Sequence, residues 1–252
     1  MSVYACSDFH GYYSIYEKIN SKLKPEDKVI FLGDAGDRGP HSLKTILAIL
    51  DNPQWIYLKG NHEDMLVGAM RYGPVSDAAF LSRYNGGGQT IQDLQNHPNC
   101  KEITKRLNDL PLYYFYHSKD NGLDFHCTHA GFTPKGNTLN VYEQASEHDL
   151  IWDREHLHDW GYYYLPELYF NAYILHGHTP VENMTEYYDI EGHWMGEKLH
   201  SPYIYSQNNK INIDAGTYYT HEAYLFNLDD FSFETIKTDE GEVNGEDDEE
   251  TN

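Results

Sequence analysis

The sequence of 252 residues is poor in cysteine and in basic residues, and it has no long apolar run. Its three cysteines are odd in number and unpatterned, which argues against a disulfide framework and indicates a reducing, cytoplasmic location. No apolar run approaches the roughly 18 residues that a membrane span needs, so we expect no membrane association. The first residues lack a basic segment followed by a long apolar one, so we also expect no signal peptide.

Basic residues are outnumbered by acidic ones, 18 against 40, which gives a formal net charge of −22. Nucleic acids bind to basic surfaces, so this balance argues against a nucleic-acid partner. Part of the acidic excess lies in residues 239–252, which contain no Lys or Arg. We expect 239–252 to be a disordered, solvated tail, with recruitment of a partner as the alternative, and 1–238 to form a single domain.

Over the first 70 residues, short apolar runs alternate with segments in which apolar residues recur at helical spacing. Runs at 3–6, 29–32 and 55–58 are predicted strands, and a helical pattern of apolar residues follows each of them. This alternation predicts βαβ units and a mainly parallel sheet. Further strands are predicted in the second half, at 111–117, 123–127, 173–175, 210–213, 223–228 and 231–236. The sequence therefore predicts an α/β protein in which a βαβ half joins a β-rich half.

Polar clusters follow five of these predicted strands. They are Asp8-Phe9-His10-Gly11, Gly33-Asp34-Ala35-Gly36-Asp37-Arg38-Gly39, Gly60-Asn61-His62-Glu63, Thr128-His129-Ala130-Gly131 and Gly177-His178-Thr179-Pro180. Ligands of open α/β sheets bind outside the carboxyl ends of the strands, so we expect these clusters to meet in one crevice.

Asp and His side chains together suit divalent ions of intermediate softness, such as manganese, zinc or iron. The clusters offer six candidate ligands: Asp8, His10, Asp34, Asn61, His129 and His178. Six ligands exceed the needs of one tetrahedral ion and suit two bridged ions. One strand-end Asp alone is ordinarily a turn former, and one His alone a packed or surface residue. The repetition of the pattern at five strand ends is what indicates a metal site.

Together these clusters resemble the motifs of the calcineurin-like metallophosphoesterases, specifically the phosphoprotein phosphatase family and its bacterial and phage branch, to which the phosphatase of bacteriophage lambda belongs. The family pattern is Gly-Asp-x-His-Gly, Gly-Asp-x-x-Asp-Arg-Gly, Gly-Asn-His-Glu, a His before Ala or Gly, and Gly-His-Thr-Pro. Its counterparts here span residues 7–180. Asn85-Gly86-Gly87-Gly88 and Trp152-Asp153-Arg154 also resemble that branch. The resemblance implies a sandwich of two mixed β-sheets flanked by helices, with 1–238 as the catalytic domain.

The resemblance also implies a role for each motif residue. Asp8 and His10 would hold the first metal, Asp34 would bridge both metals, and Asn61, His129 and His178 would complete the second. His62 and Asp37 would form an acid pair, and Arg38, Arg154 and Asn61 would bind the substrate.

Elementary chemistry agrees with these roles. Two metals about 3.5–4 Å apart can bind phosphoryl oxygens and activate a water as the nucleophile. Arginines bind the remaining oxygens with a planar fork of donors. His62 can protonate the leaving oxygen, and Asp37 can fix its tautomer. Manganese is the expected metal, with iron or zinc as alternatives.

Three features depart from the family pattern. Ser7 stands where the family has Gly, a change that leaves both neighbouring ligands in place. Residues 217–221 differ from the usual phage-type ending. The segment 183–209 is longer than in the phage enzymes, and it is either a lid over the site or a surface hairpin without substrate contact.

The resemblance implies a dinuclear metal-dependent phosphomonoesterase, most simply a Ser/Thr-type protein phosphatase acting on phosphorylated proteins or small phosphoesters. A dinucleoside polyphosphate hydrolase, acting on diadenosine tetraphosphate, is the alternative, since residues 38–43 resemble those hydrolases too. The pair Asp37 and Arg38 favours the phosphatase, because the symmetrical hydrolases usually lack the second Asp. A non-catalytic metal-binding module remains as a second alternative, disfavoured because every expected ligand and acid is present.

Overall fold

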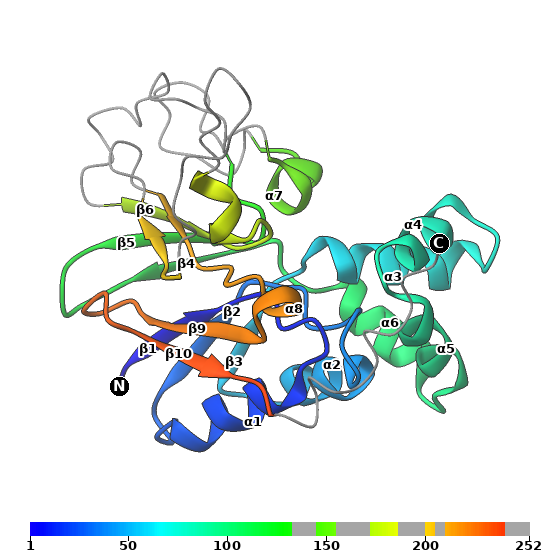
Figure 1. The fold of residues 1–252 in the computed structure, drawn as a ribbon, viewed down its shortest axis with the longest axis horizontal. Helices are drawn as coiled ribbons and strands as arrows, with labels where there is room; N and C mark the ends of the chain where they lie inside the picture. Colours follow the sequence, from blue (N-terminus) through cyan, green and yellow to red (C-terminus); the bar gives the residue numbers. More distant parts are fainter. Residues whose placement is uncertain (133–144, 155–171, 186–199, 205–209, 240–252) are drawn as a thin grey trace.

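Two five-stranded β-sheets face each other in the computed structural model, which describes residues 1–132, 145–154, 172–185, 200–204 and 210–239 (Figure 1). The first sheet has the strand order β10-β9-β1-β2-β3. Its strands are β1 (Val3–Cys6), β2 (Lys28–Phe31), β3 (Trp55–Tyr57), β9 (Glu222–Asn227) and β10 (Phe233–Lys237). β1, β2 and β3 run parallel, whereas β9 is antiparallel to both β1 and β10.

The second sheet has the strand order β4-β5-β6-β8-β7. Its strands are β4 (Tyr113–His117), β5 (Asp124–Thr128), β6 (Ala172–His176), β7 (Tyr203–Ile204) and β8 (Lys210–Asn212). β5, β6 and β8 are parallel, and β4 and β7 are antiparallel edge strands. Both sheets are therefore mixed, and the predicted fold class is confirmed.

Alternating side chains along β1 and β2 build two separate cores. Ala5 and Ile30 lie in the apolar cluster between the sheets, together with Phe125 of β5. Their neighbours Cys6 and Phe31 point to the opposite face, where helices cover the first sheet. Burying a side chain such as Phe31 contributes roughly 1.5–3 kcal/mol, so both faces of this sheet hold it in place.

Helices flank the first sheet and extend beyond its β3 side (Figure 1). They are α1 (Tyr13–Lys22), α2 (Ser42–Leu50), α3 (Asn61–Tyr72), α4 (Asp77–Tyr84), α5 (Gly88–Asn96) and α6 (Cys100–Asn108). Two shorter helices, α7 (Glu147–Trp152) and α8 (Thr217–Thr220), and the 3₁₀ turn Val181–Thr185 lie near the second sheet and the strand ends. Helices α4, α5 and α6 are not predicted from the sequence pattern.

Several other expectations concern particular segments. All three cysteines are free, and burial raises the pKa of the Cys6 and Cys127 thiols. In the described ranges, no helix combines the length and the apolarity needed to cross a membrane. The segment 183–209 and the tail 239–252 lie largely outside the described residues, so their predicted roles stay predictions.

Candidate dinuclear metal site

The loops after β1, β2, β3, β5 and β6 meet at the carboxyl ends of their strands, as predicted. A pocket of about 210 Å³ opens there. Its lining includes His10, Asp34, Arg38, Asn61, His62, Arg154 and His178. Seven of the predicted site residues therefore line one concave surface, although they come from distant parts of the sequence.

Left-handed backbone conformations mark the predicted site. Eight non-glycine residues of the described ranges have a positive φ. Six of them are predicted site residues: Asp8 (57°), His10 (47°), Asp34 (61°), Asp37 (68°), Arg38 (70°) and His178 (68°). Each such residue costs about 1–2 kcal/mol, and strain of this kind concentrates at functional sites. Bonds between the loops offset it: the His10 amide donates to the Asp34 carbonyl at 3.0 Å, and the Gly39 amide donates to the His10 carbonyl at 2.8 Å.

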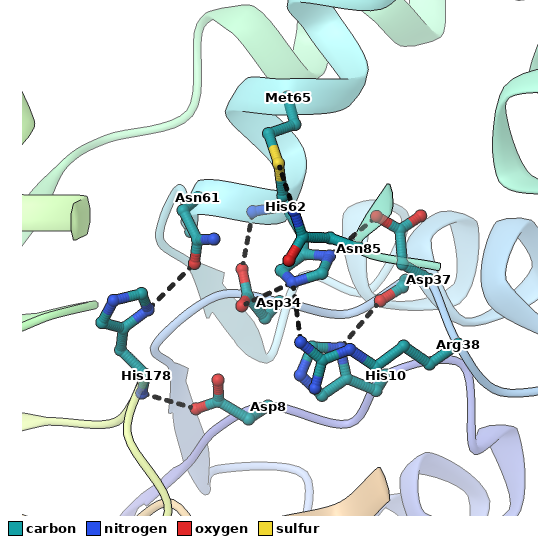
Figure 2. A network of polar contacts seen from close by, with 12 residues as sticks. Asp8, His10, Asp34, Asp37, Arg38, Asn61, His62, Met65, Asn85 and His178 are labelled. Atoms are coloured by element: carbon teal, nitrogen blue, oxygen red, sulfur yellow. Dashed lines mark hydrogen bonds and ion pairs between the residues drawn. The ribbon is translucent and has the colours of Figure 1, made fainter. Parts of the chain in front are cut away.

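Asn61, His129 and His178 bring three ligand atoms to one point beside Asp34. Nδ1 of His129 donates to the Leu32 carbonyl at 2.9 Å, which leaves Nε2 directed into the site. That Nε2 atom lies 2.9 Å from Oδ1 of Asn61, 3.1 Å from Nδ1 of His178 and 3.4 Å from Oδ2 of Asp34. Oδ1 of Asn61 is also 2.9 Å from Nδ1 of His178 (Figure 2). This convergence of ligand atoms suits a cation, which would bind Nε2 of His129 in place of a proton.

The electrostatics of this cluster favour positive charge. Burial alone would lower the pKa of His129, but the charges of Asp34 and Asp8 raise it to about 9. Burial, with the charges of His129 and Arg154, lowers the pKa of His178 well below its usual range. His178 is therefore neutral, the form that binds a metal ion.

A second group of ligand atoms lies on the other side of Asp34. Side-chain atoms of His10, Asp34 and His62 lie within 4.8 Å of one another. Nδ1 of His10 is 3.1 Å from the Gly36 carbonyl and donates to it, which leaves Nε2 for a ligand. Burial, with the Arg38 and His62 charges, lowers the pKa of His10 well below its usual range, so this imidazole is also neutral. Asp34 belongs to both groups and stands where a bridging carboxylate would stand.

Asp8 lies beside these groups without being a member of either of them. Its Oδ2 atom accepts a hydrogen bond from the His178 amide at 3.1 Å (Figure 2). It accepts another from the hydroxyl of Ser7. Its carboxyl is buried, and burial raises its pKa, with Asp34 adding to the effect and His129 opposing it. Two buried carboxyls so near each other are stabilised by a cation, so the residues present fit a pair of divalent ions.

His62 and Asp37 form a buried pair next to this group. Nδ1 of His62 donates to Oδ2 of Asp37 at 2.7 Å, and Nε2 is left 3.8 Å from Oδ2 of Asp34 (Figure 2). Burial would lower the pKa of His62, but the charge of Asp34 and the hydrogen bond and charge of Asp37 raise it above its usual value. His62 thus has the partner and the charge state of a general acid.

Two arginines line the same pocket. A terminal nitrogen of Arg38 lies 3.5 Å from Nε2 of His62, and its guanidinium carbon lies 5.3 Å from the centre of the Tyr218 ring. Nε of Arg154 donates to the hydroxyl of Thr179 at 3.2 Å. Both guanidinium groups can therefore reach an anion held between the metal ligands.

Glu63, the last residue of the Gly-Asn-His-Glu motif, has a structural role that was not predicted from the sequence. Its buried carboxylate accepts hydrogen bonds from the amides of Asp34, Ala35 and Gly60 and from the Tyr57 hydroxyl, at 2.8–2.9 Å. Glu63 thereby joins the loop after β2 to the start of α3. A Glu three residues after a helix N-cap is the signal that could have identified it.

Tyr218 also went unpredicted, because residues 217–221 differ from the expected ending. Asp214 is a further buried carboxyl of the pocket lining. Its Oδ1 atom accepts from the Gly216 amide at 2.7 Å, which fixes the turn that leads into α8.

Residues 1–214 match the calcineurin-like phosphoesterase family, and the chain belongs to this family. The metal-ligand chemistry of the pocket is in keeping with that assignment.

Similar proteins in the family differ in their named substrates. The chain is 25% identical over 218 residues to serine/threonine-protein phosphatase 2 of Escherichia coli K12, covering 85% of this chain and 87% of that protein. It is also 25% identical over 154 residues, 60% of the chain, to the symmetrical bis(5'-nucleosyl)-tetraphosphatase of Dechloromonas aromatica, and it spans only 51% of that hydrolase. A solved serine/threonine phosphatase from Saccharomyces cerevisiae shares the fold, with a TM-score of 0.60 at 15% identity over 95% of this chain and 81% of that chain.

Proposed function

We propose that the protein is a dinuclear metal-dependent phosphomonoesterase, specifically a Ser/Thr-type protein phosphatase. Asp8, His10 and Asp34 would hold one divalent ion, and Asp34, Asn61, His129 and His178 would hold the other. The ions, manganese by preference, would supply an activated water and neutralise charge on the phosphoryl group. Arg38 and Arg154 would bind and orient the phosphoryl oxygens, with the amide of Asn61 at the same phosphate.

The observation that carries the proposal is the buried contact of 2.7 Å between His62 and Asp37. Hydrolysis of a phosphoserine releases a strongly basic alkoxide, which needs a proton as it leaves. A nucleoside polyphosphate leaves as a weakly basic phosphate and has much less need of one. A protonated imidazole, held by Asp37 and positioned beside Arg38, therefore supports an alkoxide leaving group.

Diadenosine tetraphosphate hydrolysis is the second candidate, because a relative with that named activity also matches the chain. Both substrates present phosphoryl oxygens to the same arginines and metals, so those groups do not discriminate between them. The acid pair does discriminate, since the symmetrical hydrolases usually lack the counterpart of Asp37.

The experiment compares kcat/KM of the manganese-loaded protein on four substrates: phosphoserine, phosphothreonine and phosphotyrosine peptides, and diadenosine tetraphosphate. We expect the phosphoserine and phosphothreonine peptides to be the better substrates. A preference for the dinucleotide by more than about tenfold, equivalent to about 1.4 kcal/mol, would replace the first candidate by the second.

A further inference from the structure

Two consecutive non-glycine residues, Asp37 and Arg38, have left-handed backbone conformations, with φ of 68° and 70°. Asp37 is the hydrogen-bond partner of His62, and Arg38 is a candidate phosphate-binding residue. Each would gain about 1–2 kcal/mol by leaving the left-handed conformation if nothing opposed the change. The positions of the Asp37 and Arg38 side chains therefore depend on the contacts that hold this turn in its left-handed conformation.

The loop Asn85–Gly87, between α4 and α5, packs against this turn. The Arg38 amide donates to the Gly86 carbonyl at 3.1 Å, and the Gly87 amide donates to the Ser82 carbonyl at 2.8 Å. Nδ2 of Asn85 also lies 3.8 Å from Sδ of Met65 in α3, the helix that carries His62 (Figure 2). The loop thus contacts both elements that carry the acid pair.

The two glycines of this loop leave no room for a side chain. A Cβ atom on Gly86 would lie 2.8 Å from Cγ of Arg38. One on Gly87 would lie 2.8 Å from Oδ2 of Asp37, 2.9 Å from the Ser82 carbonyl and against Oγ of Ser82. Oδ2 of Asp37 is the atom that accepts from His62. Gly88 differs, since its Cβ would be 3.9 Å from Cγ of Arg83, an ordinary contact.

We propose that the loop Asn85–Gly87 is a positioning element of the active site, with a separate role for each glycine. Gly87 keeps open the space that the Asp37 carboxylate occupies when it orients His62. Gly86 holds the backbone and stem of Arg38, and so places its guanidinium at the phosphate. This inference rests on the proposed function, because it assumes that His62 protonates a leaving alkoxide.

Three neighbouring Gly→Ala variants test it in the manganese-loaded protein, with a phosphoserine peptide and p-nitrophenyl phosphate as substrates. Gly87→Ala should lower kcat/KM on the peptide by roughly tenfold or more, and on the aryl ester by less than about threefold, because a phenolate leaves without general acid help. Gly86→Ala should lower kcat/KM on both substrates alike, since both present the same phosphoryl oxygens. Gly88→Ala should leave both rates unchanged.

The fold of each variant is checked by its Tm and its metal-to-protein ratio. Because Gly87→Ala also meets Oγ of Ser82, the double variant Ser82→Ala/Gly87→Ala removes that contact while it keeps the contacts with Asp37 and with the Ser82 carbonyl. Ser82→Ala alone is its control. The double variant should show the same selective loss on the peptide.

The positioning role of Gly87 would be overturned if a folded Gly87→Ala or double variant lost kcat/KM equally on the two substrates. It would also be overturned if Gly87→Ala and Gly88→Ala had equal effects on kcat/KM. His62→Asn in the same assay separates this failure from failure of the proposed function. If His62→Asn is selective for the peptide and the Gly87 variants are not, only the positioning role is wrong. If His62→Asn is not selective, the acid assignment is wrong and the role of Gly87 falls with it.

Discussion

Nδ1 of His62 lies 2.7 Å from Oδ2 of Asp37, and both side chains are almost completely buried. The two residues come from different elements, Asp37 from the turn after β2 and His62 from the first turn of α3. Glu63 joins these elements by accepting the amides of Asp34 and Gly60. The Glu63 carboxylate, which need not touch substrate, therefore helps to set the geometry of His62, the proposed acid.

The charges of Asp34 and Asp37 should set the pH range of the reaction. Burial lowers the pKa of His62, and Asp34 and Asp37 raise it above its usual value. An acid must be protonated, so activity on a phosphoserine peptide should fall as the pH rises through this raised pKa. Asp37→Asn removes one of the two raising charges and should move the alkaline limb of kcat/KM to lower pH. An unmoved limb, at unchanged metal content, would assign that limb to another group.

Asp34 should matter more for metal content than His10, because only Asp34 belongs to both ligand groups. After desalting of manganese-loaded protein, Asp34→Asn should retain fewer ions per chain than His10→Asn, by elemental analysis. Wild-type protein treated with a chelator should lose activity, and added manganese should restore it. Equal metal content in the two variants would remove Asp34 from the bridging role.

Glu63→Gln should destabilise the protein, because the buried carboxylate accepts from three amides and one hydroxyl. A glutamine offers one oxygen and turns an NH₂ group towards amide donors, and each buried donor left unpaired costs about 1–3 kcal/mol. Urea unfolding should show a loss of at least that size. Glu234→Gln is a matched control, since Glu234 pairs with Lys22 on the surface, and exposed pairs contribute about 0–1 kcal/mol. Similar losses in both variants would contradict a structural role specific to Glu63.

Tyr218 should help to place Arg38, whose guanidinium carbon lies 5.3 Å from the centre of its ring. A cation–π contact of this kind contributes about 0.5–1 kcal/mol at exposed sites, so Tyr218→Ala should lower kcat/KM about two- to fivefold. The loss should be similar for peptide and aryl substrates, because Arg38 binds the phosphoryl oxygens common to both. Tyr218→Phe keeps the ring and should behave like wild type; a loss in this variant equal to that of Tyr218→Ala would point to the hydroxyl instead.

The sequence predicts the site well where the chemistry follows directly after a strand. Asp34 and His129 follow the carboxyl ends of β2 and β5, and ligand groups gather outside such ends. The two side chains lie 3.4 Å apart although their strands belong to different sheets. The positions of α4, α5 and α6 could not be predicted in the same way. Each is short and buries few apolar side chains, such as Ile91 and Leu94 in α5. So few apolar positions do not give a recognisable helical period in the sequence.

Backbone strain and through-space contacts also lie beyond the sequence pattern. The motif around Asp37 gives no sign that this residue is left-handed, or that Gly87, fifty residues away, lies against its carboxylate. Likewise, the participation of His62 in a metal-sized group with His10 and Asp34 depends on side-chain directions that only the folded chain defines.

Leaving-group dependence in the His62→Asn variant tests the central claim most directly. The measurement is kcat/KM of wild type and His62→Asn, both manganese-loaded, on a phosphoserine peptide and on p-nitrophenyl phosphate. The account predicts a loss of roughly 10²–10⁴-fold on the peptide, a much smaller loss on the aryl ester, and near-normal metal content because Asn61 remains in place. Equal losses on both substrates together with loss of metal would make His62 a metal ligand or a structural residue. The general acid would then have to be sought among the other residues that line the pocket.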